Sequence, residues 1–187
     1  MGKIAPPETS ILFVGILCRK KEYFSTAREA LQKQFGDILM ESPVLPWDYT
    51  DYYRDELGWP ITRTFLFFRD AINTGDLADV KLTTREIEYQ LSEQGKRNVN
   101  LDPGYLTLAK VVLASTKNYA HRICIGKGIY AEVTLIHRKG HYRPHLFTYT
   151  DYASDAVREI FEQARDFLKR TTLSRSSLDA CRHREPL

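Results

Sequence analysis

Residues 121–137 read His121-Arg122-Ile123-Cys124-Ile125-Gly126-Lys127-Gly128-Ile129-Tyr130-Ala131-Glu132-Val133-Thr134-Leu135-Ile136-His137. Two mainly apolar runs flank the glycine-rich centre, which is the pattern of a β-hairpin. The second run alternates in polarity, so one face is expected in the core: Ile129, Ala131, Val133 and Leu135. Because hairpin strands pair antiparallel and other segments have helical spacing, the sequence predicts an α+β fold, a mixed or antiparallel sheet packed with helices.

The first half of the chain adds three expected strands. The apolar, β-branched run Ile11–Leu17 is typical of a buried central strand. Residues 38–45 and 62–68 read as further strands, the former at an edge because it holds Pro43. With a helix ending near Gly36, a second helix and a short strand at 98–101, this order favours a ferredoxin-like βαββαβ unit.

Capping patterns predict where the helices begin. Thr83-Thr84-Arg85-Glu86 matches a capping box, which predicts a helix from about Thr84 to Gln94. Asp102-Pro103 has the form of an N-cap followed by proline at the first helical position. Apolar residues at helical spacing follow it, so a helix is expected to begin at Asp102 and continue to about Leu113.

The composition predicts a single domain over residues 1–170. A last helix is expected around Val157–Leu168, and residues 171–187, rich in Ser, Thr and charge, are expected to form a flexible C-terminal tail. No apolar run approaches the roughly 20 residues of a membrane span. Three scattered cysteines fit a reducing compartment, and the chain is expected to be soluble and cytoplasmic.

Charge is distributed unevenly along the chain. Residues 37–93 hold twelve acidic against five basic side chains, whereas residues 94–145 hold nine basic ones against only Asp102 and Glu132. Either the two stretches neutralise each other in the fold, or the basic stretch lines a site for an anion.

Several segments carry a resemblance to a known family. They are Phe13-Val14-Gly15-Ile16, Tyr49-Thr50-Asp51-Tyr52-Tyr53, Asn98–Lys110, Tyr119-Ala120-His121-Arg122 and Gly126–Leu135. Over nearly all of the chain up to about Arg170, these segments make it similar to the bacterial family catalogued as domain of unknown function 4416. The resemblance implies no particular activity, so candidate chemistry rests on the residues themselves.

The hairpin turn is the first candidate site. Gly126, Lys127 and Gly128 could offer a lysine and backbone amides to a phosphate, with Arg122 and His121 adding positive charge. Tyr105 is a further candidate ligand-binding residue. The turn is not a P-loop, because G-x-x-x-x-G-K-[ST] would require glycine at 121 and a hydroxyl residue at 128. An ordinary turn with a solvated lysine is the alternative.

Glu132 and His121 are the candidate catalytic residues. Glu132 lies in the middle of an expected strand, so it is either exposed or, if that face is covered, in need of a cationic partner. A Glu132–His121 pair would be an acid/base couple. Asp102 could serve as a base or metal ligand, although a helix cap already accounts for it.

A transition-metal site is not expected. His121 and Cys124 would point to opposite faces of a strand, and Gly140 and Pro144 break the four-residue spacing of His137, His141 and His145. Magnesium is the one cofactor that the sequence suggests. A magnesium-bound phosphate would bring together the acidic, aromatic segment 47–56 and the hairpin turn.

Three functions from different classes follow. The first is binding, with or without turnover, of a phosphorylated small molecule such as a nucleotide. The second is binding of RNA or other nucleic acid through the basic C-terminal half, with Arg138, Lys139 and Arg143 on phosphates and Tyr119, Tyr130 or Tyr142 stacking on bases. The third is an interaction module without catalysis. Neither the oligomeric state nor the ligand follows from the sequence.

Overall fold

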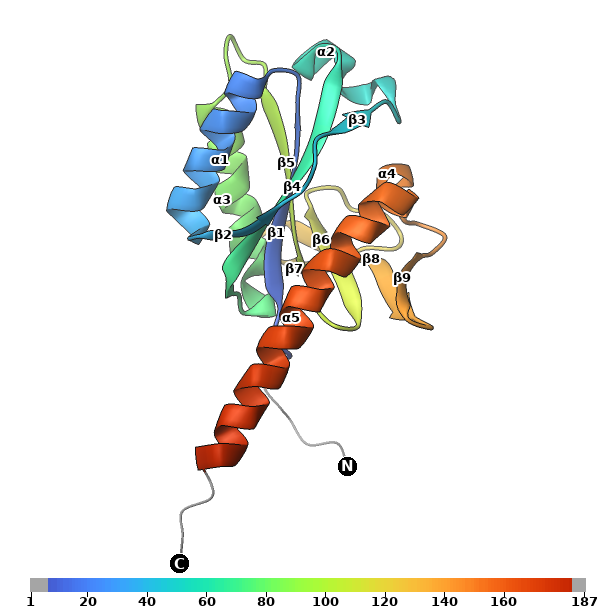
Figure 1. The fold of residues 1–187 in the computed structure, drawn as a ribbon. Coiled ribbons are helices and arrows are strands. Elements are labelled where there is room, and N and C mark those ends of the chain that lie inside the picture. Colours follow the sequence, from blue (N-terminus) through green and yellow to red (C-terminus); the bar gives the residue numbers. More distant parts are fainter. Residues whose placement is uncertain (1–6, 183–187) are drawn as a thin grey trace, which may run out of the picture.

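One curved antiparallel sheet organises the chain (Figure 1). The structure, a computed structural model, describes residues 7–182 and the side chains of residues 7–172. Within that range nine strands form the sheet in the order β2-β4-β1-β5-β6-β8-β7, with β3 paired to β4 and β9 to β8. The strands are β1 (Ile11–Cys18), β2 (Ile38–Glu41), β3 (Leu45–Trp47), β4 (Ile61–Ala71), β5 (Val99–Leu106), β6 (Lys110–Ser115), β7 (Ile123–Gly126), β8 (Ile129–Arg138) and β9 (His141–Pro144).

Five α-helices and two short 3-10 turns accompany these strands in the described part of the chain. They are α1 (Lys21–Phe35), η1 (Asp51–Tyr53), α2 (Arg54–Leu57), η2 (Thr74–Asp76), α3 (Leu77–Gln90), α4 (Thr150–Ala153) and α5 (Asp155–Arg182). The predicted α+β class with an antiparallel sheet is therefore confirmed. None of the helices described is both long and apolar enough to cross a membrane.

The first half has the predicted ferredoxin-like connectivity. The elements β1, α1, β2, β4, α3 and β5 follow one another as βαββαβ, with β3 inserted before β4. Their strands lie in the order β2-β4-β1-β5, and every neighbouring pair is antiparallel. All eight residues of β1 are buried, as the apolar run predicted, because β1 lies at the centre with helices on both of its faces.

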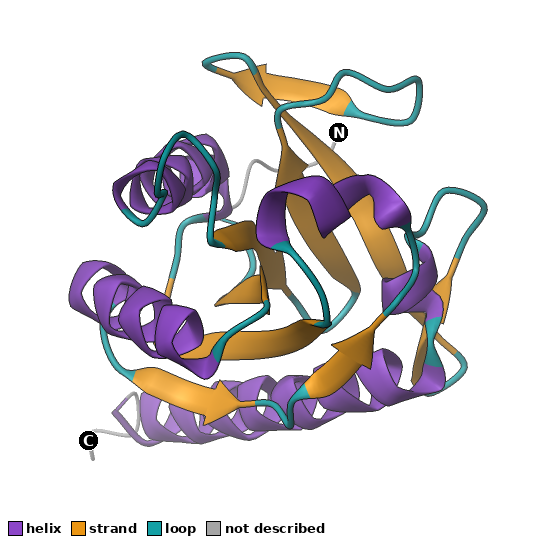
Figure 2. Cartoon of the chain, turned by 90° about the horizontal axis from the view of Figure 1, so that it is seen from above, coloured by secondary structure: helices purple, strands orange, loops and turns teal. Residues whose placement is uncertain are grey.

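Two apolar layers cover the two faces of the sheet. On one face, β1 and β4 contribute Phe13, Phe65 and Phe67, which pack around Phe161 of α5. On the other face, α1 and α3 pack on the opposite side chains of β1, with Leu31 and Ile87 in that layer. Figure 2 shows the long α5 and the pair α1 and α3 separated by the curved sheet.

The helix expected after Asp102 does not form. Asp102 and Pro103 lie inside β5, which pairs with β1 along its whole length. The pairing of β5 with β6 covers only residues 104–106. Pro103 has no N–H to give to a ladder, so the β5–β6 pairing stops where proline stands. Asp102 and Pro103, which together can begin a helix, mark in this structure the point where β5 and β6 separate.

The hairpin prediction is confirmed, but the expected alternation along β8 is wrong. Strands β7 and β8 pair antiparallel around the Gly126–Gly128 turn. Against β6, however, Leu135 faces Val111 and Val133 faces Val112, which leaves Thr134 as an extra residue. Beyond such an extra residue, the side chains point to the opposite faces from those that strict alternation predicts. Glu132 therefore shares its face with Leu135 and is buried, whereas Val133 is exposed.

Three further elements have different bounds from those that the sequence predicts. Helix α3 begins at Leu77, so Thr84 is internal, and its hydroxyl donates to the carbonyl of Lys81 instead of capping the helix. The strand expected at 38–45 is divided into β2 and β3 around Pro43. Helix α5 continues to Arg182, beyond the tail boundary expected after residue 170, and residues 183–187 lie outside the described residues.

Substitution of Gly104 tests how closely the strands approach each other at the β5–β6 junction. A Cβ there would lie 2.3 Å from the Val112 carbonyl oxygen and 2.5 Å from a Phe13 ring carbon. We expect Gly104→Ala to lower the free energy of unfolding by roughly 3 kcal/mol, the upper end of the usual cost of overpacking. Urea denaturation measures this change. Gly75→Ala, whose Cβ would meet only the exposed Asn73 side chain, is the control and should have little effect.

Candidate functional site

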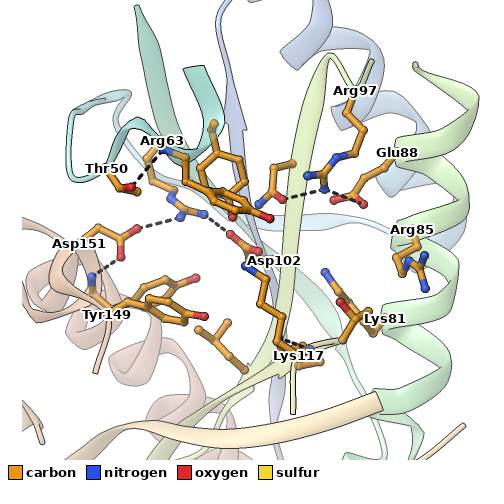
Figure 3. Close-up of a pocket in the computed structure, with 18 of the residues that line it drawn as sticks. Thr50, Arg63, Lys81, Arg85, Glu88, Arg97, Asp102, Lys117, Tyr149 and Asp151 are labelled. Carbon is orange, nitrogen blue, oxygen red and sulfur yellow. Dashed lines mark hydrogen bonds and ion pairs between the residues drawn. The ribbon is translucent and has the colours of Figure 1, made fainter. Parts of the chain in front are cut away.

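A cavity of about 450 Å³ opens where β5 and β6 part (Figure 3). Its walls come from β5, the end of β6, α3, the β3–β4 segment (residues 48–60), the β6–β7 loop (residues 116–122) and residues 149–152 around α4. We call it the charged cavity. Its basic lining residues are Arg63, Lys81, Arg85, Arg97, Lys117 and Arg122. Its acidic ones are Glu88, Asp102, Glu132 and Asp151.

Side chains of α3 replace the missing strand partner of β5. Beyond the end of the β5–β6 pairing, the Leu101 N–H donates to Glu88 Oε1 at 2.6 Å, and the Leu101 carbonyl accepts from Lys81 Nζ at 2.7 Å. A buried backbone group without a partner costs about 1–3 kcal/mol, so these bonds stabilise the open edge. They also bring two charged residues to the wall of the cavity.

A buried arginine joins three elements at the cavity floor. Arg63 of β4 donates to Oδ2 of Asp102 on β5 and to Oδ2 of Asp151 in α4, each at 2.8 Å. Gly15 of β1 lies between these strands, and a Cβ there would be 2.8 Å from the guanidinium, so only glycine leaves room for the bridge. Burial by itself would lower the pKa of Arg63, but Asp151 and Asp102 raise it above its usual range. Arg63 therefore keeps its charge.

A second arginine fixes the segment that covers the cavity. Arg97 binds both carboxylate oxygens of Glu56 in α2, at 2.6 and 2.7 Å, and also donates to Asn100 of β5 at 3.0 Å. The hydrogen bonds from Arg97 lower the pKa of Glu56. Because a planar guanidinium fits a carboxylate in this two-bond geometry, α2 is held firmly against the end of β5.

A third arginine organises the β6–β7 loop. Arg122 Nε donates to Glu132 Oε2 at 2.7 Å, and both side chains are almost fully buried. The other guanidinium nitrogens of Arg122 donate to the Ser115 hydroxyl, the Lys117 carbonyl and the Tyr149 hydroxyl. Arg122 thus ties the loop that carries Lys117 to the sheet.

The predicted Glu132–His121 pair does form. His121 Nε2 lies 2.9 Å from Glu132 Oε2, and the imidazole stacks on Phe147 with ring centroids 4.5 Å apart. Arg122 shares the same oxygen, and His121 is not among the residues that line the charged cavity. The geometry favours Glu132 as the residue that holds Arg122 and His121 in place, and a catalytic role for the pair stays a prediction.

Two cations at the cavity rim have no acidic partner among the described residues. Arg85 projects from α3 and is exposed. Lys117 projects from the β6–β7 loop, with its ammonium 4.3 Å from the centre of the Tyr52 ring. Aromatic rings accompany these cations in the lining: Trp47, Tyr52, Tyr53, Tyr89, Tyr149 and Tyr152.

The structure separates the residues of the predicted phosphate site. Arg122 and Glu132 line the charged cavity, whereas Gly126, Lys127, Gly128 and Tyr105 do not. Lys127 forms an exposed ion pair with Asp79 of α3. Acidic side chains of segment 47–56 are paired as well: Arg54 of the same segment binds Asp48 and Asp51, and Arg97 binds Glu56.

The described residues contain no group of three or more His, Cys, Asp or Glu side chains placed to hold a metal ion. Glu56 of the acidic segment is paired with Arg97, and Lys127 of the hairpin turn is paired with Asp79. A magnesium-bound phosphate held by both segments stays a prediction.

Several cavity residues carried no clear signal in the sequence. Arg63 lies in an apolar strand, and Lys81, Arg85 and Glu88 read as the solvated face of a helix. A weak signal was available at Arg63, because a charged residue near the start of a buried strand requires a partner. Which residue would supply that partner depends on strand order, which the local sequence does not contain.

The molecule is thus an α+β protein whose antiparallel sheet parts to form a charged cavity. Its sequence matches the family model described as Domain of unknown function (DUF4416) over residues 8–167, and the chain belongs to that family. Neither the curated proteins nor the solved structures include a match to it.

Glu132→Gln tests the buried ion pair. Removing one partner of a buried pair typically costs about 3–5 kcal/mol, because the remaining charge stays buried without compensation. We expect a loss near the lower end of this range in urea denaturation, since glutamine keeps one acceptor oxygen. Lys127→Ala removes an exposed pair and should change stability by less than about 1 kcal/mol. Equal effects of the two variants would contradict the assigned burial.

Asp102→Asn tests the charge of the floor carboxylate. Burial would raise the pKa of Asp102, but Arg63 and Lys81 hold it below the ordinary value of 3.8. A group whose pKa is lowered by folding stabilises the protein above its unfolded pKa and loses that contribution as the pH falls through its folded pKa. The variant should therefore be less stable than the wild type at pH 7, and the difference should shrink below pH 3.8. A difference that stays constant on acidification would contradict this.

Proposed function

We propose that this protein binds a phosphorylated small molecule, such as a nucleotide, in the charged cavity. The observation that carries the proposal is the excess of positive charge there. Of the described lining residues, six are basic and four are acidic. Three lining cations form no ion pair among the described residues: Lys81, whose ammonium donates to the Leu101 carbonyl, and Arg85 and Lys117, which stand exposed at the cavity on different elements.

The three other arginines of the lining are paired with carboxylates, so their charges are already balanced. Arg63, Arg97 and Arg122 are each held by buried or half-buried carboxylates. These pairs fix the walls, and an anion that enters would meet the two uncompensated charges at the rim. Charge-assisted hydrogen bonds to phosphate oxygens are stronger than neutral ones, and both lysine and arginine provide them.

The aromatic lining favours a ligand with a planar ring. Tyr52 and Tyr89 are largely exposed at the cavity, at 61% and 75%. Rings of this kind stack on nucleobases irrespective of base identity. A nucleotide combines a phosphate with such a ring, and the cavity volume of about 450 Å³ lies within the usual range for small-molecule sites.

The nucleic-acid alternative has less support. Arg138, Lys139 and Arg143 are exposed near the β8–β9 turn. The Tyr142 side chain between them is fully buried, with its hydroxyl bonded to the Thr107 carbonyl, so it is not accessible for stacking on a base. This alternative predicts RNA binding that weakens steeply with salt.

Ligand-dependent thermal unfolding tests the proposal. A ligand at 100 times its Kd stabilises the native state by about 2.7 kcal/mol, so a binding nucleotide should raise Tm in a saturable way. Arg85→Ala and Lys117→Ala should each weaken binding by tenfold or more, as expected for loss of a charged hydrogen bond of about 1.5–3 kcal/mol.

Lys127→Ala is the matched control, because this lysine lies outside the charged cavity. It should bind as the wild type does. Loss of binding in Lys127→Ala alone would move the site to the hairpin turn. The absence of any shift across a panel of nucleotides and sugar phosphates would refute the proposal.

A further inference from the structure

One carboxylate of the charged cavity is more accessible than the rest. The side chains of Glu88, Glu132 and Asp151 are 6%, 2% and 7% exposed. Each of them accepts a hydrogen bond from a backbone N–H or from an arginine. The Asp102 side chain is 25% exposed and lies on the floor of the cavity.

Asp102 is suited to accept a hydrogen bond from a ligand. Arg63 donates to its Oδ2, which fixes the carboxylate in position. The pKa of Asp102 is held below its usual value, and an ionised carboxylate only accepts hydrogen bonds. Its negative charge repels a phosphate, so a phosphate that enters the cavity is directed away from Asp102, toward Arg85 and Lys117 at the rim.

Asn100 places a donor beside this acceptor. It lies two residues before Asp102 on β5, on the same face of the strand. Its Oδ1 accepts from Arg97 at 3.0 Å, which identifies Nδ2 as the opposite end of the amide. Nδ2 is buried in a side chain that lines the cavity, and no acceptor binds it with good hydrogen-bond geometry. Its interaction with the neighbouring Asp102 carboxylate helps to lower the pKa of Asp102, and an amide nitrogen has a second hydrogen for a ligand.

From this arrangement we infer that the ligand is a nucleotide whose nucleoside part is recognised on the cavity floor by Asp102 and Asn100. This inference rests on the proposed function and adds a specificity to it. The floor offers an acceptor and a donor side by side, and the rim offers two cations. The ribose hydroxyls and the edge of a nucleobase both present neighbouring donors and acceptors, whereas inorganic polyphosphates do not.

The wild-type protein provides the first test, with no variant needed. Its affinities for ATP, GTP, CTP and UTP are compared with that for inorganic tripolyphosphate by calorimetry. We expect at least one nucleotide to bind about tenfold or more tightly than tripolyphosphate. The 2′,3′-dideoxy form of that nucleotide shows which part of the nucleoside is recognised. If the preference over tripolyphosphate is lost, the floor binds the ribose hydroxyls; if it is retained, the floor binds the base. Equal affinity for tripolyphosphate and all four nucleotides overturns the inference.

Asp102→Asn and Asn100→Ala assign the recognition to the floor. Each should reduce nucleotide affinity about tenfold and leave tripolyphosphate affinity unchanged or higher. Asn100→Ala keeps the Arg63–Asp102 pair, so it tests whether the floor recognises the nucleoside even if Asp102→Asn folds poorly. Asp79→Asn, the same chemical change outside the cavity, is the control. Equal weakening of both ligand types overturns the inference alone, whereas binding of neither ligand type by the wild type refutes the proposed function as well.

Discussion

The end of the β5–β6 pairing at Pro103 is the constraint on which the site depends. A strand inside a sheet must satisfy its N–H and C=O groups on both sides. Proline cannot donate, so β6 leaves β5 there, and the Leu101 backbone groups are satisfied by Glu88 and Lys81 instead. A sheet that would otherwise have been continuous becomes a cavity wall with charged side chains.

The second organising feature is the placement of arginines on buried carboxylates. Arg63 connects β4, β5 and α4, and Arg97 connects α2 with β5. Arg122 connects the β6–β7 loop with β8. Such pairs are costly to bury and contribute little net stability when complete, but they leave few alternative arrangements because an unpaired member is strongly unfavourable. They hold the connecting segments of the fold in defined positions around the cavity.

Pairing across the fold explains part of the uneven charge of the sequence. Arg97 with Glu56 and Lys127 with Asp79 join the basic half to the acidic half. At the cavity, Lys117 of the basic half and Arg85 of the acidic half have no acidic partner among the described residues. In the basic stretch 94–145, Arg97 and Lys127 thus fit the interpretation of neutralisation across the fold, and Lys117 at the cavity fits the interpretation of an anion site.

The sequence by itself determined the class of the fold, the central strand Ile11–Cys18 and the β7–β8 hairpin. Hydrophobic periodicity and turn glycines are local signals, and local signals suffice for such elements. Tertiary structure alone decided the features that form the site. Whether Asp102-Pro103 begins a helix or ends a strand pairing depends on β1, which lies far away in the chain, and the bulge at Thr134 that buries Glu132 depends on register with β6. The charged cavity gathers residues from strands, helices and loops whose proximity follows from strand order, a property that no short stretch of sequence contains.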